Sequence, residues 1–453
     1  MRFLNRSLRT VQLFTFLYVI VAVLYASHFF LISPLCTGLS FLFNHSLLPW
    51  YIWTPSLTDV SPSIQSSVVE WKSLEISLEY NLGYSQPFLI DGGLFLSKTL
   101  SCSMQPSRTI PYFYRANGTF DPDDITIATL ITSNRFQVFR RLVERYQGPI
   151  SVTIHVHNSP THMQNLLESL HTLYTSSETM TTYVDVHLVI DSFDRQFNTW
   201  RNISRLFART NFVLMLDIDF YICTDFRAAM RRSKSVMNKL REGAAFVIPA
   251  FEYVNYAAGV DQSAFPQDKQ ELLALVKSKR IRMFHASWGP GHNSTDYKKY
   301  YTASTGDIYK VTQYQSAYEP YVVFLKEGPP WCNERFIGYG GNKAACLFEM
   351  YLSGVSFYVL ADHFIVHQNH LYEENVRKNE RRYNRKVYLE FKEEMCLRYL
   401  KKYHTSGLPN GAQGLNAYHE CKGIKNVERL TAEVSPPSPS DAASSSEYQI
   451  LKS

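Results

Sequence analysis

Two carboxylates separated by one residue, Asp217 and Asp219, are the groups in this chain whose type and spacing most directly indicate chemistry. They follow the apolar run 212–216, and the carboxyl end of a buried strand is where ligands bind in open α/β sheets. Two like charges buried there need a compensating cation, and carboxylate oxygens suit Mg²⁺ or Mn²⁺. The pair therefore predicts a cation site of the kind that holds a nucleotide diphosphate. The alternative is a pair of solvated loop acids, or an N-cap for a helix after 224–225.

A histidine, His367, ends a second apolar run at 364–367, about 150 residues further along the chain. Neutral imidazole is a good ligand for Mn²⁺ beside two carboxylates, so His367 is a candidate third ligand. A structural histidine is the alternative. His155 and His157 share one face of a predicted strand, but no third ligand is evident for them, and we interpret both as strand residues.

The elements that must position these side chains begin after residues 121–124. Short β-rich runs alternate with amphipathic segments of crossover-helix length, which indicates βαβ units, a doubly wound first half and a largely parallel sheet. A helix-like segment at 342–354 precedes a further strand within 356–370, whose end carries histidines. The β-rich runs are 125–133, 149–157, 184–191, 212–220 and 244–253.

Length and composition set limits on these interpretations. The 453 residues are 45% hydrophobic and 14% aromatic, which excludes a mainly disordered protein. The net charge of +6 is mild for this length, so we expect no nucleic-acid partner and interpret the basic runs 231–241 and 377–386 as solvated faces. Steering of polyanionic acceptors is the alternative for those runs. Seven cysteines without CxxC spacing argue against a zinc ribbon and leave room for one or two disulfides.

The N-terminal segment predicts the compartment. Residues 11–32 lack any Asp, Glu, Lys or Arg and follow three arginines, so they predict a membrane anchor with everything after it in the lumen. A cleaved signal peptide is the alternative. The predicted organisation is listed here: cytosolic tail 1–10, transmembrane anchor 11–32, stem and N-terminal extension 33–120, catalytic domain 121–405 and disordered Ser/Pro-rich tail 406–453.

Several sequence blocks, in one order, resemble glycosyltransferase family 49, which includes LARGE-type xylosyl- and glucuronyltransferases and a β-1,4-glucuronyltransferase. The resemblance covers about 124–402 and rests on blocks such as GPISVTIHV, VLMLDIDF, YEPYVVF and ERFIGYGGNKAACLFEM. It implies an α/β GT-A fold, that is, a Rossmann-like mixed sheet flanked by helices. It also implies inverting transfer of glucuronic acid, xylose or a related hexose from a UDP-sugar to a glycan or glycoprotein acceptor at the Golgi membrane.

The same resemblance implies roles for individual residues. Mn²⁺, or Mg²⁺, is expected at Asp217, Asp219 and His367. Arg201 and Asn202 match an Arg-Asn pair before the metal motif and are expected on the nucleotide side with Asp217, which makes glycosylation of Asn202 unexpected. His292 is expected to face the donor or the acceptor.

Two positions depart from the family pattern. Asn333 stands where the family has an Asp that is one candidate for the general base, and Asn cannot accept the proton. Glu334, one residue along, is the substitute candidate, although neighbours on a strand point to opposite faces, and retained turnover in Glu334→Gln would remove it from that role. Gly341 stands where the family has Trp, so the acceptor or the linkage is expected to differ from that of the dystroglycan glycan.

Two other functions remain open from the sequence. With Asn333 and Gly341 changed, the domain could bind a nucleotide sugar or a glycan without transferring it. A haloacid-dehalogenase-type phosphatase also uses Asp-x-Asp at a strand end, but there the motif lies on the first strand of the domain. Here three predicted strands precede it.

Overall fold

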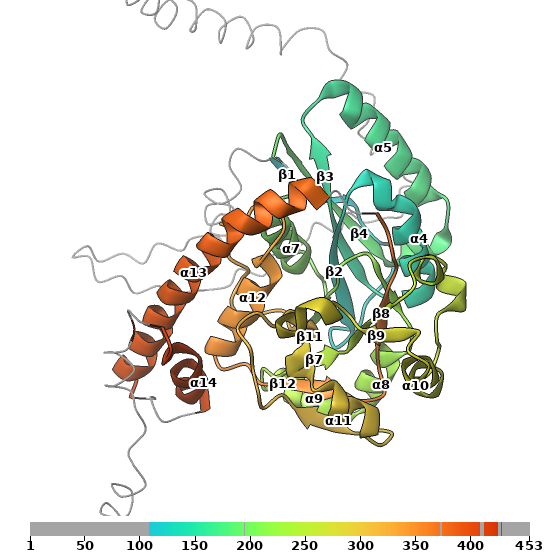
Figure 1. The fold of residues 1–453 in the computed structure, drawn as a ribbon. Helices are drawn as coiled ribbons and strands as arrows, with labels where there is room; N and C mark the ends of the chain where they lie inside the picture. The colour runs from blue at the N-terminus through green and yellow to red at the C-terminus, as the bar shows by residue number, and fades with distance from the viewer. Residues whose placement is uncertain (1–107, 194, 372–373, 408–411, 425–426, 428–453) are drawn as a thin grey trace, which may run out of the picture. The chain divides into compact units, whose positions relative to one another are not determined.

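The computed structural model of the chain describes residues 108–193, 195–371, 374–407, 412–424 and 427. These residues form a mixed α/β fold in which helices flank a large twisted sheet (Figure 1). The strands are β1 (Arg108–Tyr114), β2 (Ile125–Ile131), β3 (Ile150–His157), β4 (Val184–Asp191), β5 (Phe212–Met215), β6 (Phe220–Ile222), β7 (Ala245–Ile248), β8 (Ala250–Tyr253), β9 (Ile281–Met283), β10 (Ile308–Lys310), β11 (Tyr321–Leu325), β12 (Phe357–Leu360) and β13 (Ile365–His367).

The α-helices are α4 (Phe136–Tyr146), α5 (Pro160–Thr175), α6 (Glu178–Tyr183), α7 (Phe197–Leu206), α8 (Phe226–Arg232), α9 (Lys234–Arg241), α10 (Lys269–Lys277), α11 (Tyr297–Thr302), α12 (Asn342–Leu352), α13 (Glu374–Thr405) and α14 (Ala412–Cys421). Short 3-10 segments are η3 (Ser133–Arg135), η4 (Ala257–Gly259), η5 (Gln262–Ala264), η6 (Ala286–Gly291) and η7 (Asn293–Thr295).

The strand order confirms a mixed sheet. Within the described part of the chain, nine strands lie in the order β1-β4-β3-β2-β5-β11-β7-β12-β10. The neighbours from β4 to β5 are parallel, as the βαβ pattern predicts, but β11 runs antiparallel to both β5 and β7. The strands β1 and β10 are also antiparallel to their neighbours, so parallel pairing holds mainly for the N-terminal half.

Both faces of the large sheet are buried. Along β5, Phe212 and Leu214 enter one apolar cluster with α4 and α5, whereas Val213 and Met215 enter another with α11 and α12. A strand covered on both faces has no polar side in its sequence, which is why the run before Asp217 is continuous rather than alternating.

Three of the predicted long strands are each divided between two sheets. A four-stranded sheet of order β6-β13-β8-β9 includes the end of each of the runs 212–220, 244–253 and 356–370, while the large sheet includes the first part of each run. In the second run the break falls at Pro249, which has no N–H for a ladder and whose carbonyl accepts from Ile365. In the first run the break falls at Asp217–Asp219, so the two acids lie where the chain leaves one sheet for the other.

The predicted stem and tail need correction at their ends. Residues 108–114, inside the predicted stem 33–120, form edge strand β1 on β4; Pro111 obscures a strand in the sequence but is tolerated at an edge. The predicted tail 406–453 contains helix α14, which disulfide Cys396–Cys421 links to α13 and which buries Ala417. Composition cannot reveal a disulfide partner 25 residues away.

The remaining N-terminal predictions lie outside the described residues. None of the helices in the described ranges is long and apolar enough to cross a bilayer. The predicted anchor at 11–32 is not among those ranges. A second disulfide joins Cys332 to Cys346, and Cys223 is a buried free thiol.

Candidate active site

One cavity of about 650 Å³ lies at the carboxyl end of β5 and holds most of the chemically active side chains. Its volume falls within the range of roughly 300–1,000 Å³ typical of small-molecule sites. The loop after β5, the segment η6, the approach to β11, the N-terminus of α12 and one face of α13 form its walls. Its charged and histidine side chains are Arg201, Asp217, Asp219, His285, Glu319, Lys343, His367, His370, Arg377, Arg381 and Arg385.

The carboxylate of Asp217 is bonded through both of its oxygens. Oδ1 lies 3.1 Å from Arg201, and Oδ2 accepts from Lys343 and from the Tyr321 hydroxyl, both at 3.0 Å. Burial raises the pKa of Asp217, but Lys343 and Arg201 outweigh that effect and hold the pKa well below its ordinary value. Asp217 therefore stays ionised and orients two cationic side chains in the cavity.

The second acid of the motif lies beside two histidines. Asp219, His367 and His370 each offer a ligand atom, and these atoms all lie within 4.8 Å of one another. The register of β6 on β13 causes this proximity, since Phe220 is paired with His367 and the Gln368 N–H donates to the Asp219 carbonyl. Asp219 Oδ2 is 3.1 Å from His370 Nε2. Burial lowers the pKa of His367 to about 4, so the ring is neutral at pH 7 and can bind a cation.

The metal ligands expected from the sequence are thus partly brought together. Asp219 and His367 meet, with His370 as their third neighbour, whereas Asp217 is engaged by Arg201, Lys343 and Tyr321. His370 follows His367 by three residues in the segment HQNH, which was the available signal for it.

Of the residues expected to contact the nucleotide or the acceptor, some line the cavity and others lie behind its wall. Arg201 lines the cavity, but Asn202 lies behind it, where its side chain bonds the Cys332 backbone and Glu334. His292 is buried and only 2% exposed, with its ring 5.9 Å from the ring of His285. His285, rather than His292, reaches the cavity.

Neither residue considered as the base lies on the cavity wall. Glu334 Oε1 accepts from Asn202 at 2.8 Å, and Asn333 Oδ1 accepts from the backbone and side chain of Arg335. The cavity-lining residues pass from Tyr321 directly to Tyr339 in chain order. The structure therefore does not bring Asn333 or Glu334 to the wall of this cavity.

Gly341 stands where the family pattern has Trp, and the space beside it is occupied by a side chain from another helix. Gly341 has φ +71°, a left-handed conformation that glycine adopts readily, and a Cβ placed there would lie 3.5 Å from the Tyr388 ring. Tyr388 comes from α13 and lines the cavity itself. An aromatic ring is therefore present at this part of the wall, supplied by α13.

Comparison with known proteins identifies the family. A family model described as a glycosyl-transferase for dystroglycan matches residues 124–196 and 191–400. The chain belongs to glycosyltransferase family 49.

Relatives of this family 49 chain include much longer proteins. It is 27% identical to xylosyl- and glucuronyltransferase LARGE1 of Homo sapiens over 303 residues, which are 64% of this chain and 38% of that protein. It is 31% identical to LARGE2 of Rattus norvegicus over 256 residues, which are 55% of this chain and 35% of that protein. The chain thus spans about a third of the length of the relatives it matches.

A comparison of structures adds little. The crystal structure of GalNAc-T7 with UDP, GalNAc and Mn²⁺ aligns over 54% of this chain and 43% of that chain, at 10% identity and a TM-score of 0.34. A score this low supports no conclusion about the fold of the family 49 domain.

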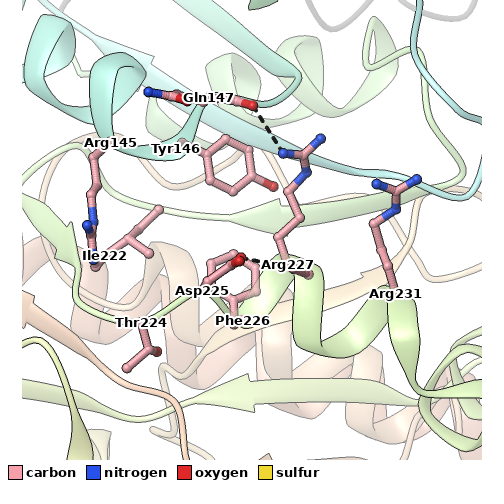
Figure 2. A pocket seen from close by; sticks show the side chains of 10 residues that line it. Arg145, Tyr146, Gln147, Ile222, Thr224, Asp225, Phe226, Arg227 and Arg231 are labelled. Carbon is pink, nitrogen blue, oxygen red and sulfur yellow. Dashed lines mark hydrogen bonds between the residues drawn. The ribbon is translucent and has the colours of Figure 1, made fainter.

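A second cavity, of about 360 Å³, shares no lining residue with the first (Figure 2). It is rich in arginine, but these arginines are bonded within the protein. Arg145 donates to the carbonyls of Ile222 and Cys223 at 2.9 and 2.8 Å, and Arg231 forms an ion pair with Asp121 at 2.8 Å.

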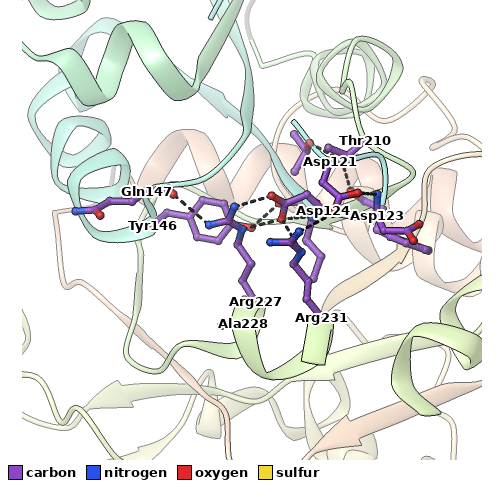
Figure 3. A network of polar contacts seen from close by, with 12 residues as sticks. Asp121, Asp123, Asp124, Tyr146, Gln147, Thr210, Arg227, Ala228 and Arg231 are labelled. Atoms are coloured by element: carbon purple, nitrogen blue, oxygen red, sulfur yellow. Dashed lines mark hydrogen bonds and ion pairs between the residues drawn. The ribbon is translucent and has the colours of Figure 1, made fainter. Parts of the chain in front are cut away.

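Arg227 forms two hydrogen bonds with Asp124, and Figure 3 shows how this pair and Arg231 connect α8 to the segment before β2. The carboxylates of Asp121 and Asp124 balance the two guanidinium groups. In this family 49 domain the second cavity is therefore part of a structural network.

Proposed function

We propose that the chain is a metal-dependent glycosyltransferase with a GT-A-type fold, which transfers a sugar with inversion from a UDP-sugar to a glycan acceptor. The proposal depends mainly on one observation, the presence in a single cavity of the Asp219, His367 and His370 group and a set of cationic side chains. The names of the relatives suggest xylose or glucuronic acid as the sugar, and a related hexose is also included in the proposal.

The histidine-containing group fits a divalent cation by its chemistry. One carboxylate and two imidazoles would hold the ion, and two nitrogen ligands favour Mn²⁺ over Mg²⁺. A bound cation would supply charge neutralisation to the diphosphate of the donor.

The cationic side chains fit a diphosphate. Among the residues that the structure describes, five basic and three acidic ones line the cavity, which leaves an excess of positive charge among them when the histidines are neutral. Lys343 and Arg201 are fixed by Asp217 at the inner end, and α13 presents Arg377, Arg381 and Arg385 at intervals of four residues, on one helix face. Cationic donors of this kind bind phosphate oxygens through charge-assisted hydrogen bonds.

Aromatic side chains in the same cavity fit the nucleobase and the sugar. Phe197, Trp288 and Tyr339 all line it, and Trp288 is 59% exposed. Flat rings of this kind bind bases by stacking and carbohydrate by apolar contact.

We also propose the membrane and compartment assignments made from the sequence: a single-pass type II protein of the Golgi membrane, with this domain in the lumen. Disulfides Cys332–Cys346 and Cys396–Cys421 support the lumenal placement, because such bonds persist in oxidising compartments and are rare in the cytosol.

Calorimetric titration of UDP into the full-length chain, with Mn²⁺ and with EDTA, tests the donor site. We expect binding in the micromolar range only with Mn²⁺. His370→Ala and Asp219→Asn should each weaken Mn²⁺-dependent binding by at least about tenfold, because each removes one of three ligands.

Matched controls are available for both variants. His162→Ala removes an imidazole from α5, and Asp261→Asn removes a carboxylate from an N-cap where Asn caps equally well, so both should bind UDP as the unmodified chain does. Binding of UDP that is unaffected by EDTA, or by both ligand variants, would contradict the proposed cation site.

A further inference from the structure

Three carboxylates of the described residues line the main cavity, and two of them have roles described above. Asp217 holds Lys343 and Arg201, and Asp219 belongs to the group with the two histidines. The third is Glu319, two residues before β11.

The sheet brings Glu319 to this place. Because β11 is antiparallel to β5, with Val322 paired to Met215, the N-terminal end of β11 lies beside the carboxyl end of β5. Tyr321 marks this proximity by donating to Asp217 at 3.0 Å. The Glu319 N–H donates to the Gly291 carbonyl at 2.8 Å, which ties the approach to β11 to the segment η6 on the same wall.

The surroundings of Glu319 suit proton transfer. The residue is half-buried, and it lines the cavity together with residues 342–344 at the start of α12. Burial raises the pKa of Glu319, with Lys343 and Arg201 opposing and Asp217 reinforcing that rise. A carboxylate that binds protons more readily than in water, beside bound substrate, is a competent general base near neutral pH.

We propose that Glu319 is the general base that accepts the proton of the acceptor hydroxyl, a role that depends on the proposed transferase function. The acceptor oxygen forms a bond to the anomeric carbon of the donor sugar. The bond from that carbon to the diphosphate oxygen breaks, and its electron pair leaves with UDP. The proton goes to the Glu319 carboxylate, which afterwards returns it to water. Glu319 thus supplies the group that Asn333 cannot supply and that Glu334 does not bring to the cavity.

A purely structural role for Glu319 predicts a different result on substitution. In that role the side chain only packs in the cavity wall, and an amide of the same size and shape fills that place as a carboxylate does. Glu319→Gln keeps an oxygen of the same reach but removes the proton acceptor. The variant therefore separates packing in the wall from proton transfer.

The test combines UDP binding with UDP release from donors. Mn²⁺-dependent UDP affinity is measured by calorimetry, and UDP release is measured from UDP-xylose, UDP-glucuronic acid, UDP-glucose, UDP-galactose and UDP-N-acetylglucosamine. Water and a mixture of aryl β-xylosides and β-glucuronides serve as acceptors. We expect Glu319→Gln to bind UDP within about threefold of the unmodified chain and to release it at least about 100-fold more slowly, the usual effect of losing a general base. Glu327→Gln, at the other end of β11 and exposed, should release UDP at the unmodified rate.

Each other outcome overturns the proposal in a distinguishable way. Release by Glu319→Gln within about fivefold of the unmodified rate removes the residue from the role of base. Loss of UDP binding in this variant makes it a positioning residue for the donor. If the unmodified chain binds UDP but releases none from any donor, the cavity is a binding site without transfer. If the unmodified chain does not bind UDP with Mn²⁺, the proposed function itself fails.

If Glu319→Gln does not fold, Glu319→Ala replaces it, because Ala places no amide in the cavity wall. Formate is then added as an external carboxylate. We expect formate to raise UDP release at least about tenfold in Glu319→Ala. No response to formate in a variant that binds UDP overturns the proposal.

Discussion

At the scale of single residues, the two acids of the Asp-x-Asp motif differ because different elements face them. Asp217 meets cations from α7 and α12 together with a tyrosine from β11, whereas Asp219 meets the end of β13 and Arg135 of η3, whose Nε lies 3.3 Å from Oδ1. Ion pairs hold the first carboxylate in one orientation, and the histidines make the second a candidate ligand.

Substitution of Lys343 tests whether Asp217 orients a cation that binds the diphosphate. Its side chain is 6% exposed, its Nζ lies 3.0 Å from Asp217 and 3.7 Å from the centre of the Tyr321 ring. We expect Lys343→Met to weaken UDP binding by at least about tenfold in calorimetry, because the diphosphate loses a cation and Asp217 loses a neighbour that lowers its pKa.

Lys310→Met, on β10 and exposed, is the matched control and should bind UDP normally. Thermal unfolding of both variants separates a loss of affinity from a loss of folded protein. Unchanged UDP affinity in folded Lys343→Met would mean that the diphosphate lies elsewhere.

Residue patterns predicted part of this site. Asp219 and His367 could be selected because each follows an apolar run, and a buried polar residue at the end of a strand is conspicuous in a sequence. Glu319 could not be selected in this way, since its place depends on β11 pairing antiparallel with β5, and no local pattern encodes that pairing. Glu334 was a candidate because it lies one residue after the position of the family Asp. In the structure its side chain is bonded to Asn202 and does not line the cavity.

At the scale of elements, α12, α13 and α14 form a unit that closes one side of the site. They share an apolar cluster that includes Phe348, Phe391, Leu400 and Ala417, and α13 runs along α12 in Figure 1. The Tyr388 hydroxyl donates to the Ser316 carbonyl, which connects α13 to the segment before Glu319. Changes in this unit should therefore affect both stability and the cavity wall.

Glu420 on α14 makes the stability of this unit depend on pH. Burial raises the pKa of Glu420 from 4.5 to about 7, and Lys392 on α13 opposes that rise. The folded state thus holds a proton that the unfolded chain has already lost, so the free energy of unfolding falls as pH rises from about 5 to 7 and levels off above that.

We expect Glu420→Gln to raise the unfolding temperature by a few degrees at pH 8 and to leave it unchanged at pH 4.5, as measured by calorimetry. Glu390→Gln, exposed on α13, controls for the loss of a surface carboxylate. An equal shift at both pH values would show that proton binding by Glu420 is not the cause.

Most elements of the N-terminal half followed from the sequence, and those of the C-terminal half followed less well. The parallel strands β2 to β5 are short apolar runs rich in β-branched residues, and their length and the amphipathic segments between them identify them as strands. The division of three runs between two sheets could not be predicted, because the local sequence does not encode which strands each part of a run pairs with. Helix α14 was not predicted, because a disulfide and a small buried face hold it in place and neither is evident in the composition of the segment.

At the scale of the whole molecule, the excess positive charge is modest, but part of it is concentrated at the cavity. The net charge of the chain is +6, and three arginines of α13 face the same site as Lys343 and Arg201. Such an arrangement favours the approach of an anionic donor at low ionic strength. It also explains why the basic run 377–386 is only partly a solvated face: one side of that helix lines the cavity.

The most direct test of the account is a crystal structure of the protein with UDP and Mn²⁺, measured with X-rays at the manganese absorption edge. We predict one anomalous peak within about 2.3 Å of Asp219, His367 and His370, with the diphosphate of UDP between that peak and Lys343. A peak on Asp217 without the histidines, or UDP bound outside this cavity, would contradict the account.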